Sequence, residues 1–168
     1  MVADTIRLLF FPALMAFAAS SDLFTMTISN RLSLALVAGF AVLAVMTGMS
    51  LSDVAMHLAA AGLVLAIAFG FFAAGWIGGG DAKLVAATAL WFGFGHLMDY
   101  LLYASIFGGV LTLLLLKFRT LPLPAMLERQ PWIKRLHDAA GGVPYGIALA
   151  AAALVVYPKT GWMPGAVS

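Results

Sequence analysis

Two aspartates stand where long apolar stretches of the chain end, and their side chains could do chemistry there. Asp22 follows two serines at the end of an apolar run, and Asp81 follows a run of three glycines at 78–80 between two apolar runs. An ionisable residue at membrane depth costs free energy and is by default a functional candidate. The glycines before Asp81 let the backbone turn and leave room for another chain to approach.

Two carboxylates that face one another can hydrolyse a peptide bond. Like charges at close range cannot both ionise, so one carboxyl group keeps its proton. The ionised member takes a proton from a bound water, which attacks the peptide carbonyl, while the protonated member donates to the carbonyl oxygen. We therefore expect Asp22 and Asp81 to be a catalytic pair that needs no metal and no cofactor.

The same residues also have structural explanations. Asp22 could cap a helix or pair with Arg31, and Asp81 could cap the helix that follows it, with Lys83 extending towards the headgroups. A serine–lysine peptidase is a further alternative, in which Lys83 would act with a serine at 20, 21 or 29. No serine stands at a distinguishing spacing from that lysine.

The composition is that of an integral membrane protein. Of 168 residues, 64% are hydrophobic and only 10% are charged, whereas a soluble domain is about half apolar and about a quarter charged. The net charge of +2 is too small to indicate a nucleic-acid partner. The chain has no cysteine, and its three histidines at 57, 96 and 137 are too far apart to form a ligand pair, so we expect no metal site.

Apolar runs long enough to cross a bilayer recur along the chain. A spanning helix needs about 20 mainly apolar residues, and the roughly ten-residue alternation of outer-membrane strands is missing. We predict an all-α fold, a polytopic bundle of six transmembrane helices that forms a single domain over residues 1–168. The predicted spans are 5–21, 32–49, 54–75, 82–97, 100–117 and 142–158.

The basic residues predict one orientation in the membrane. Arg31, Lys83 and the five basic residues between 117 and 135 fall at one set of alternate span ends, and only Arg7 and Lys159 fall at the other. The positive-inside rule then places the loops at 22–31, 76–81 and 118–141 in the cytoplasm and both termini outside.

Two segments allow more than one interpretation. The first, with Arg7, an apolar run and Ala16-Phe17-Ala18, resembles a cleavable signal peptide, but a retained membrane anchor is favoured. The long loop at 118–141 contains a predicted amphipathic helix at 125–139. It is either a basic connector attracted to anionic lipid or a lid or substrate-binding element beside the aspartates.

At these residues the sequence resembles the prepilin peptidases, membrane aspartyl proteases of the Gly-x-Gly-Asp type. It is most similar to the short form associated with tight-adherence (Flp-type) pili. Three stretches carry the resemblance in order along nearly the whole chain. They are Ser21-Asp22 with Ile28-Ser29-Asn30-Arg31, the Gly-Gly-Gly-Asp-Ala-Lys-Leu stretch at 78–84, and the Val-Pro-Tyr-Gly-Ile-Ala stretch at 143–148.

The resemblance implies an endopeptidase of the bacterial inner membrane. Such enzymes remove the short basic leader of type IV or Flp-like prepilins at the cytoplasmic face, after a glycine and before a hydrophobic helix. It also implies Asp22 and Asp81 as the catalytic pair, with Gly78 and Gly80 as points of close backbone approach. The remaining supporting or substrate-orienting residues that it implies are Asn30, Lys83 and Tyr145.

The sequence departs from the family pattern in two ways. Ser29 stands where the family usually has proline, which should loosen that loop. Larger members carry a cysteine-rich cytoplasmic segment and also methylate the new N-terminus. Because this chain has no cysteine, we expect a peptidase without methyltransferase activity.

Two other classes of membrane protein share part of the pattern. A non-enzymatic transporter or pilus-assembly scaffold could use the aspartates for proton coupling, but a transporter should show internal repeats or polar residues near several helix midpoints. A presenilin-type protease shares Gly-x-Gly-Asp but expects a Tyr-Asp pair deep within a span. Asp22 instead follows a serine at a span end.

Overall fold

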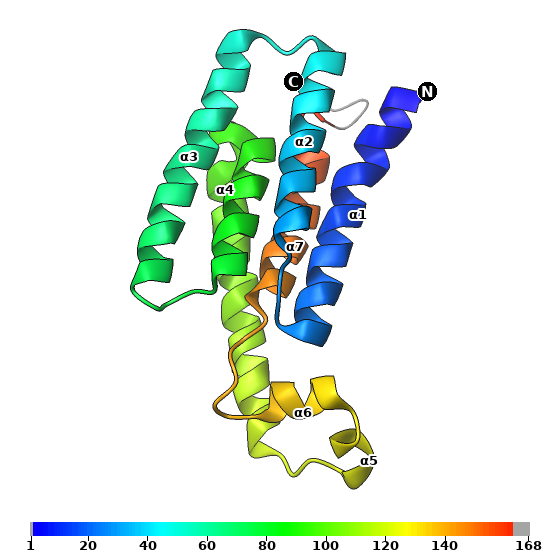
Figure 1. The fold of residues 1–168 in the computed structure, drawn as a ribbon, viewed down its shortest axis with the longest axis vertical. Helices are drawn as coiled ribbons and strands as arrows, with labels where there is room; N and C mark the ends of the chain where they lie inside the picture. The colour runs from blue at the N-terminus through cyan, green and yellow to red at the C-terminus, as the bar shows by residue number, and fades with distance from the viewer. Residues whose placement is uncertain (1, 163–168) are drawn as a thin grey trace.

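The part of the chain that the structure describes consists of helices joined by loops, without a strand. The computed structural model describes residues 2–162. Its elements are α1 (Val2–Thr25), α2 (Asn30–Thr47), α3 (Leu51–Ala73), α4 (Gly79–Thr120), α5 (Ala125–Glu128), α6 (Pro131–His137), α7 (Tyr145–Val156) and the 3₁₀-helix η1 (Tyr157–Lys159). The all-α prediction is confirmed. Figure 1 shows a bundle of long helices with α5 and α6 set apart at one end.

The helix α4 is a hairpin of two arms. At Gly93 the backbone leaves the helical conformation, with φ 55° and ψ −172°, and the α4 ribbon turns back on itself (Figure 1). The rings of Phe92 and Tyr100 therefore lie 5.1 Å apart. Asp81 and Ala104 line one groove, although a straight helix would hold them about 35 Å apart. We call residues 79–92 the first arm and residues 94–120 the second arm.

The turn of α4 depends on glycine at position 93. Its positive φ lies in the left-handed region that side chains disfavour. A Cβ atom there would lie 3.0 Å from the imidazole of His57, a residue of α3 that is hydrogen-bonded to the Leu90 carbonyl at 2.7 Å. The predicted spans at 82–97 and 100–117 correspond to the two arms. The chain reverses at residue 93, however, and the predicted boundary at 98–99 is wrong.

Four helices within residues 2–162 are long and apolar enough to cross a membrane. They are α1, α2, α3 and α4, the last counted once with both arms, while α7 and η1 form a shorter apolar helix, Tyr145–Lys159. The first arm rises only about 20 Å, against a hydrocarbon core of about 30 Å. A polytopic helical membrane protein is confirmed, but the count of six spans is not, because the first arm and α7 are both short.

Serine side chains mark the starts of α2 and α3. Ser29 Oγ accepts a hydrogen bond from the Leu32 N–H at 3.4 Å, and Ser50 Oγ accepts one from the Asp53 N–H at 3.1 Å. These bonds satisfy donors that the first turn of a helix leaves free. Ser29, where the resembling family usually has proline, therefore has a local role as the N-cap of α2.

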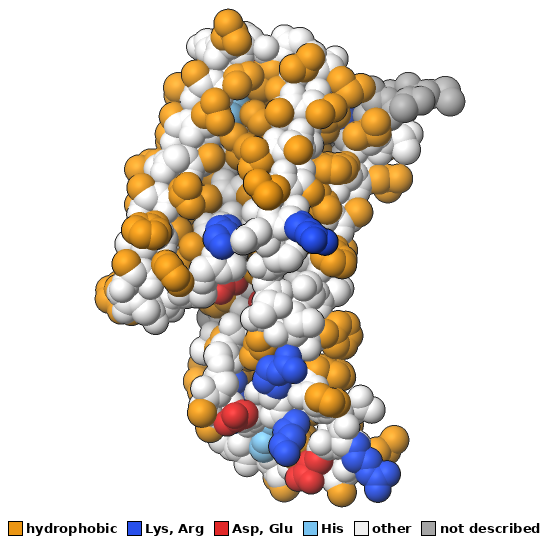
Figure 2. All heavy atoms as spheres, in the orientation of Figure 1, with side chains coloured by type: hydrophobic (Ala, Val, Ile, Leu, Met, Phe, Trp, Pro, Cys, Tyr) orange, Lys and Arg blue, Asp and Glu red, His pale blue; other side chains and the backbone are white. Residues whose placement is uncertain are grey.

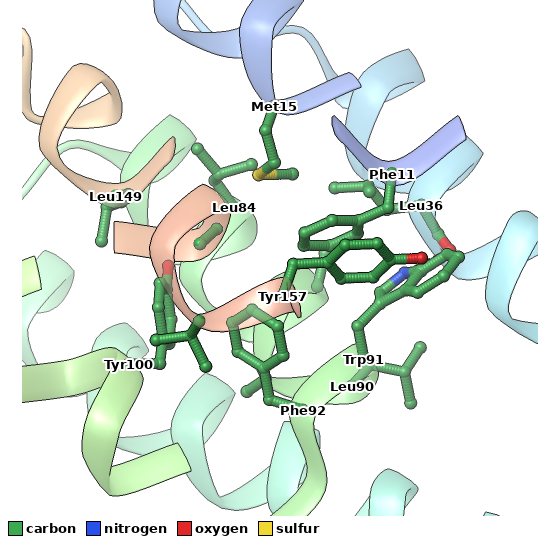
Figure 3. Packing of buried hydrophobic residues seen from close by; sticks show 14 of the residues in the cluster. Phe11, Met15, Leu36, Leu84, Leu90, Trp91, Phe92, Tyr100, Leu149 and Tyr157 are labelled. Carbon is green, nitrogen blue, oxygen red and sulfur yellow. Dashed lines mark hydrogen bonds between the residues drawn. The ribbon is translucent and has the colours of Figure 1, made fainter. Parts of the chain in front are cut away.

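A cluster of aromatic rings joins the helices at the end of the bundle away from α5 and α6. Figure 3 shows Phe11, Trp91 and Tyr157 packed together, with ring centroids 4.5 Å apart for Phe11 and Tyr157 and 4.9 Å for Phe11 and Trp91. Trp91 Nε1 donates to the Leu36 carbonyl at 3.0 Å. Four helical segments (α1, α2, the first arm and η1) are thereby fixed to one another at this end of the bundle. The aspartates lie at the opposite end.

The outer surface of the bundle is apolar, as lipid contact requires. Large hydrophobic side chains such as Val45 and Leu51 are 82% and 88% exposed. Figure 2 shows them over the upper part of the molecule, whereas Lys and Arg side chains gather over the lower part. That lower end carries the starts of α2 and α4, the end of the second arm, and α6. The α1 backbone at Arg7 lies at the opposite end, where it accepts a hydrogen bond from Tyr157 at 2.7 Å.

Candidate active site

Asp22 is a buried carboxylate near the end of α1. Only 5% of its surface is exposed, and it is the one charged residue among the buried residues that the structure describes. Its Oδ2 accepts a hydrogen bond of 2.7 Å from the backbone N–H of Gly146. N–H groups in the first turn of a helix have no partner within it, and the helix dipole favours a carboxylate there. The start of α7 therefore holds Asp22 in place.

Gly146 leaves no space for a side chain of its own. A Cβ atom would lie 2.8 Å from Asp22 Oδ2 and 2.7 Å from Ile28 Cδ1. Sequence reasoning selected its neighbour Tyr145 and missed Gly146, because a backbone donor has no side-chain signature. The available signal was a glycine in the first turn of a helix, where its propensity is poor.

Asp81 lies in the first turn of α4, and Gly78 is the N-cap of that helix. The Gly78 backbone is hydrogen-bonded to the Asp81 side chain, like the half of a capping box in which the third helical residue reaches back. A Cβ atom on Gly78 would lie 3.0 Å from Asp81 Oδ2. The capping interpretation of Asp81 thus describes its local bonding, and that bonding also fixes the direction of its carboxylate.

Gly80 lets the loop after α1 lie directly against the start of α4. A Cβ atom at Gly80 would lie 3.1 Å from Ile28 Cβ and 3.3 Å from the Ile28 backbone nitrogen. Ile28 also packs against Gly146, so this one side chain lies between the starts of α4 and α7. The close approach expected at Gly80 is made to a neighbouring loop of the same chain. Ile28 was overlooked as a site residue because it has no polar group.

Both aspartates line one pocket of about 850 Å³. They are close enough for the charge of Asp22 to act on Asp81. The volume lies within the range of about 300–1,000 Å³ that is common for ligand sites. The residues that line this aspartate pocket are Asp22, Met26, Gly75, Trp76, Ile77, Gly78, Asp81, Thr112, Arg135, Gly141, Gly142, Val143 and Tyr145.

Tyr145 forms part of the wall of the aspartate pocket. It begins α7, and its ring and hydroxyl group occupy the space that a side chain on Gly108 would take. Its position is therefore set by the second arm of α4. The structure brings Asp22, Asp81, Gly78 and Tyr145 together around one space.

Asn30 and Lys83 lie elsewhere. Lys83 Nζ donates a hydrogen bond of 2.7 Å to Asn30 Oδ1, on the exposed surface. The two residues line a separate apolar groove between α2, α3 and the first arm. The hydrogen bond between them joins the start of α2 to the start of α4. Neither residue lines the aspartate pocket.

The long loop reaches the aspartate pocket through α6. Arg135 lines the pocket, and its Nη1 donates to the Phe24 carbonyl at 3.0 Å. The rings of Phe24 and Trp132 meet edge to face at 5.3 Å. The amphipathic helix predicted at 125–139 is divided into α5 and α6. Of its two interpretations, the contacts of α6 favour an element beside the aspartates.

Arg119, at the end of the second arm, holds the C-terminal part of this loop. Its Nε donates to the Leu136 carbonyl at 2.9 Å, and its Nη2 donates to the carbonyls of Gly141 at 3.0 Å and Gly142 at 2.8 Å. Both glycines line the aspartate pocket. One guanidinium group, with its rigid fork of donors, thereby sets the backbone on one side of the site.

No group of three or more His, Cys, Asp or Glu residues that could hold a metal ion occurs within residues 2–162. His57 and His96 line another pocket, next to the turn of α4, and His137 is hydrogen-bonded to the Leu121 carbonyl at 2.8 Å. A mechanism without a metal remains a prediction.

The two buried or half-buried carboxylates, the glycines around them and the membrane-spanning helices can be compared with known proteins. A model of the type IV leader peptidase family matches residues 9–113, more than half of the chain, and this range includes Asp22, Asp81 and the glycine run. The chain belongs to this family. Leader peptidases of this family are proteases of the aspartic type with prepilin substrates, so the protein is placed among peptidases and not among transporters. No curated protein and no solved structure matches the chain.

The match to the leader peptidase family model ends at residue 113, before Tyr145 and Gly146. The third stretch of the resemblance, at 143–148, lies outside the matched range. This stretch contacts the site through the hydrogen bond that the Gly146 N–H donates to Asp22.

Proposed function

We propose that Asp22 and Asp81 together activate a water molecule that hydrolyses the bond between the leader and the mature part of a prepilin. The observation that carries the proposal is that both carboxylates line a single pocket at the basic end of the helix bundle. Each carboxylate is held by a backbone group, Gly146 for Asp22 and Gly78 for Asp81. Two carboxylates fixed in this way are pre-organised for acid–base work.

The reaction follows from the chemistry of a carboxylate pair that shares one proton. The ionised aspartate takes a proton from water as the water oxygen attacks the carbonyl carbon of the scissile bond. The protonated aspartate donates its proton to the carbonyl oxygen, which gives a neutral tetrahedral gem-diol. The first aspartate then protonates the leaving amine while the other takes back a hydroxyl proton. The carbon–nitrogen bond breaks, and the pair is restored.

The glycines of the pocket provide a place for an extended substrate backbone. Gly75, Gly78, Gly141 and Gly142 all contribute to the lining, so the backbone there is not covered by side chains of its own. An extended peptide can approach such a surface closely. A substrate held this way would present its carbonyl group to the two carboxylates.

The orientation and location belong to the same proposal. The end with the aspartates carries most of the lysines and arginines, and the positive-inside rule assigns such an end to the cytoplasm. We therefore place the enzyme in the bacterial inner membrane with its site facing the cytoplasm. The absence of cysteine from the sequence supports a peptidase of the Flp-pilus type that does not methylate its product.

The test is cleavage of a co-expressed Flp-type prepilin by the wild-type protein and by the Asp22→Asn and Asp81→Asn variants. Each substitution removes one acid–base group and keeps the shape of the side chain. We expect cleavage to fall by roughly 10²–10⁴-fold in each, the usual contribution of acid–base catalysis. The measurement is the fraction of substrate converted over time, seen as a mobility shift on a gel.

Asp99→Asn is the matched control, because Asp99 is an exposed aspartate at the other end of the bundle, close to the turn of α4. It should cleave at the wild-type rate. Near-normal cleavage by either Asp22→Asn or Asp81→Asn, at equal protein levels, would refute the two-aspartate mechanism.

A further inference from the structure

An apolar groove, distinct from the one that Asn30 and Lys83 line, opens from the aspartate pocket into the spanning part of the molecule. It has a volume of about 290 Å³ and lies between α3, both arms of α4 and α7. Val64 and Phe71 contribute from α3, Leu101 and Ser105 from the second arm, and Leu149 from α7. Apart from Asp81, the side chains that line it are uncharged and nearly all are apolar.

The groove and the aspartate pocket are joined at the aspartate itself. Ile77, Asp81 and Tyr145 line both spaces. Along the second arm, Ser105 lines the groove and Thr112 lines the pocket, while Tyr145 packs on Gly108 between them. The two spaces form one path that changes from polar to apolar at Asp81.

We propose that this groove binds the apolar side chains that follow the scissile bond, and so helps to select the substrate. The inference rests on the proposed function, because it takes Asp81 as the position of the cut. A chain that lies along the path puts a polar segment in the aspartate pocket and an apolar segment in the groove. The groove is too small for a whole helix, which is about 10 Å across. It fits the side chains of one or two residues that project from the substrate.

Ser105 is the position from which the groove can be filled. It is exposed and its side chain lines the groove, so a larger residue there extends into the groove without replacing a core side chain. The series Ser105→Ala, Ser105→Leu and Ser105→Trp removes the hydroxyl group and then adds volume in steps. Ile106→Trp is the matched control, because Ile106 is the exposed neighbour on the same helix and does not line the groove.

The probes are two forms of a membrane-anchored prepilin, with either Phe or Ala as the first residue after the cut. For the wild-type enzyme we expect the Phe form to be cleaved faster, by about tenfold, the usual discrimination of an apolar pocket. The ratio of the two rates should stay the same in Ser105→Ala and Ile106→Trp. It should fall in Ser105→Leu and approach one in Ser105→Trp, because filling the groove slows cleavage of the Phe form more than cleavage of the Ala form.

Two outcomes would overturn the inference. One is an unchanged Phe-to-Ala ratio in Ser105→Trp with both rates near their wild-type values, and the other is an unchanged ratio with both rates lowered by the same factor. Both outcomes are separable from a failure of the proposed function. That failure would appear as cleavage by Asp22→Asn or Asp81→Asn, whereas the groove is judged only from the ratio between two substrates.

Discussion

Asp22 is positioned by a residue that has no side chain. Its carboxylate receives a 2.7 Å hydrogen bond from the Gly146 N–H, and Gly146 is packed against both Asp22 and Ile28. At this scale the site depends as much on small residues as on acidic ones. Each glycine near an aspartate gives a direct way to move one carboxylate without removing it.

The substitution Gly146→Ala should displace Asp22, because the added methyl group would lie 2.8 Å from its Oδ2. We expect cleavage to fall by roughly tenfold to a hundredfold, since small displacements of a catalytic group have effects of that size. The measurement is prepilin cleavage at matched protein levels. Gly109→Ala is the control, since nothing lies within 4 Å of a Cβ atom there. Wild-type cleavage by Gly146→Ala would contradict the prediction.

Lys83 allows its two interpretations to be separated. Lys83→Met removes the 2.7 Å hydrogen bond to Asn30, which is exposed and should contribute about 0.5–1.5 kcal/mol to stability. Because Lys83 does not line the aspartate pocket, we expect a slightly lower melting temperature in detergent and nearly normal cleavage. The opposite result, normal stability with poor cleavage, would assign Lys83 a role in orienting the substrate.

The acidic residues of the site could be selected from the sequence, but the way they are held could not. Asp22 and Asp81 are conspicuous because carboxylates are rare at the ends of apolar segments. The contacts of Gly146 and Ile28 are made by backbone and hydrocarbon, which occur throughout the chain and carry no chemical label. The contact of Tyr145 with Gly108 depends on how α7 meets the second arm, and this is a matter of tertiary packing.

At the scale of elements, the turn of α4 determines which residues meet. It brings Asp81 of the first arm beside Leu101 and Ser105 of the second arm. The sequence predicts two apolar segments here, and both exist as arms. The point of reversal could not be predicted accurately, because the apolar residues continue through it and two glycines, Gly93 and Gly95, stand there. Only the φ value and the contact with His57 identify Gly93 as the turning point.

The substitution Gly93→Ala should destabilise the hairpin. An alanine would be forced to a φ of 55°, and its Cβ atom would lie 3.0 Å from His57. A backbone strain of this kind costs about 1–3 kcal/mol, so we expect a lower melting temperature in detergent. Gly95→Ala is the control, because nothing lies within 4 Å of a Cβ atom there. Equal melting temperatures for the two variants would count against the proposed role of Gly93.

At the scale of the whole molecule, charge and shape together predict how the protein lies in the membrane. The chain has no cysteine, so single cysteines can report on each end. Glu128→Cys lies in α5 at the basic end, and Leu51→Cys lies at the start of α3, where Leu51 is 88% exposed. If the basic end is cytoplasmic, a membrane-impermeant maleimide should label Leu51→Cys in spheroplasts of intact inner membrane and should leave Glu128→Cys unlabelled.

Permeabilised cells provide the control for this experiment, because both cysteines should react once the reagent can cross the membrane. The reverse pattern in intact spheroplasts would invert the orientation. In that case the aspartate pocket would open away from the cytoplasm, and the proposed substrate could not reach it from the side on which prepilins are made.

The unequal arms of α4 have a consequence for the lipid around the enzyme. The first arm rises about 20 Å and the second about 40 Å, and the second arm continues past the level of Asp81 with exposed residues such as Leu113 and Leu116. A hydrophobic stretch shorter than the bilayer is accommodated by local thinning of the lipid. Such hydrophobic mismatch beside Asp81 would bring the aqueous phase down to the carboxylates. The short arm would thus supply water, the second reactant of hydrolysis, to a site at membrane depth.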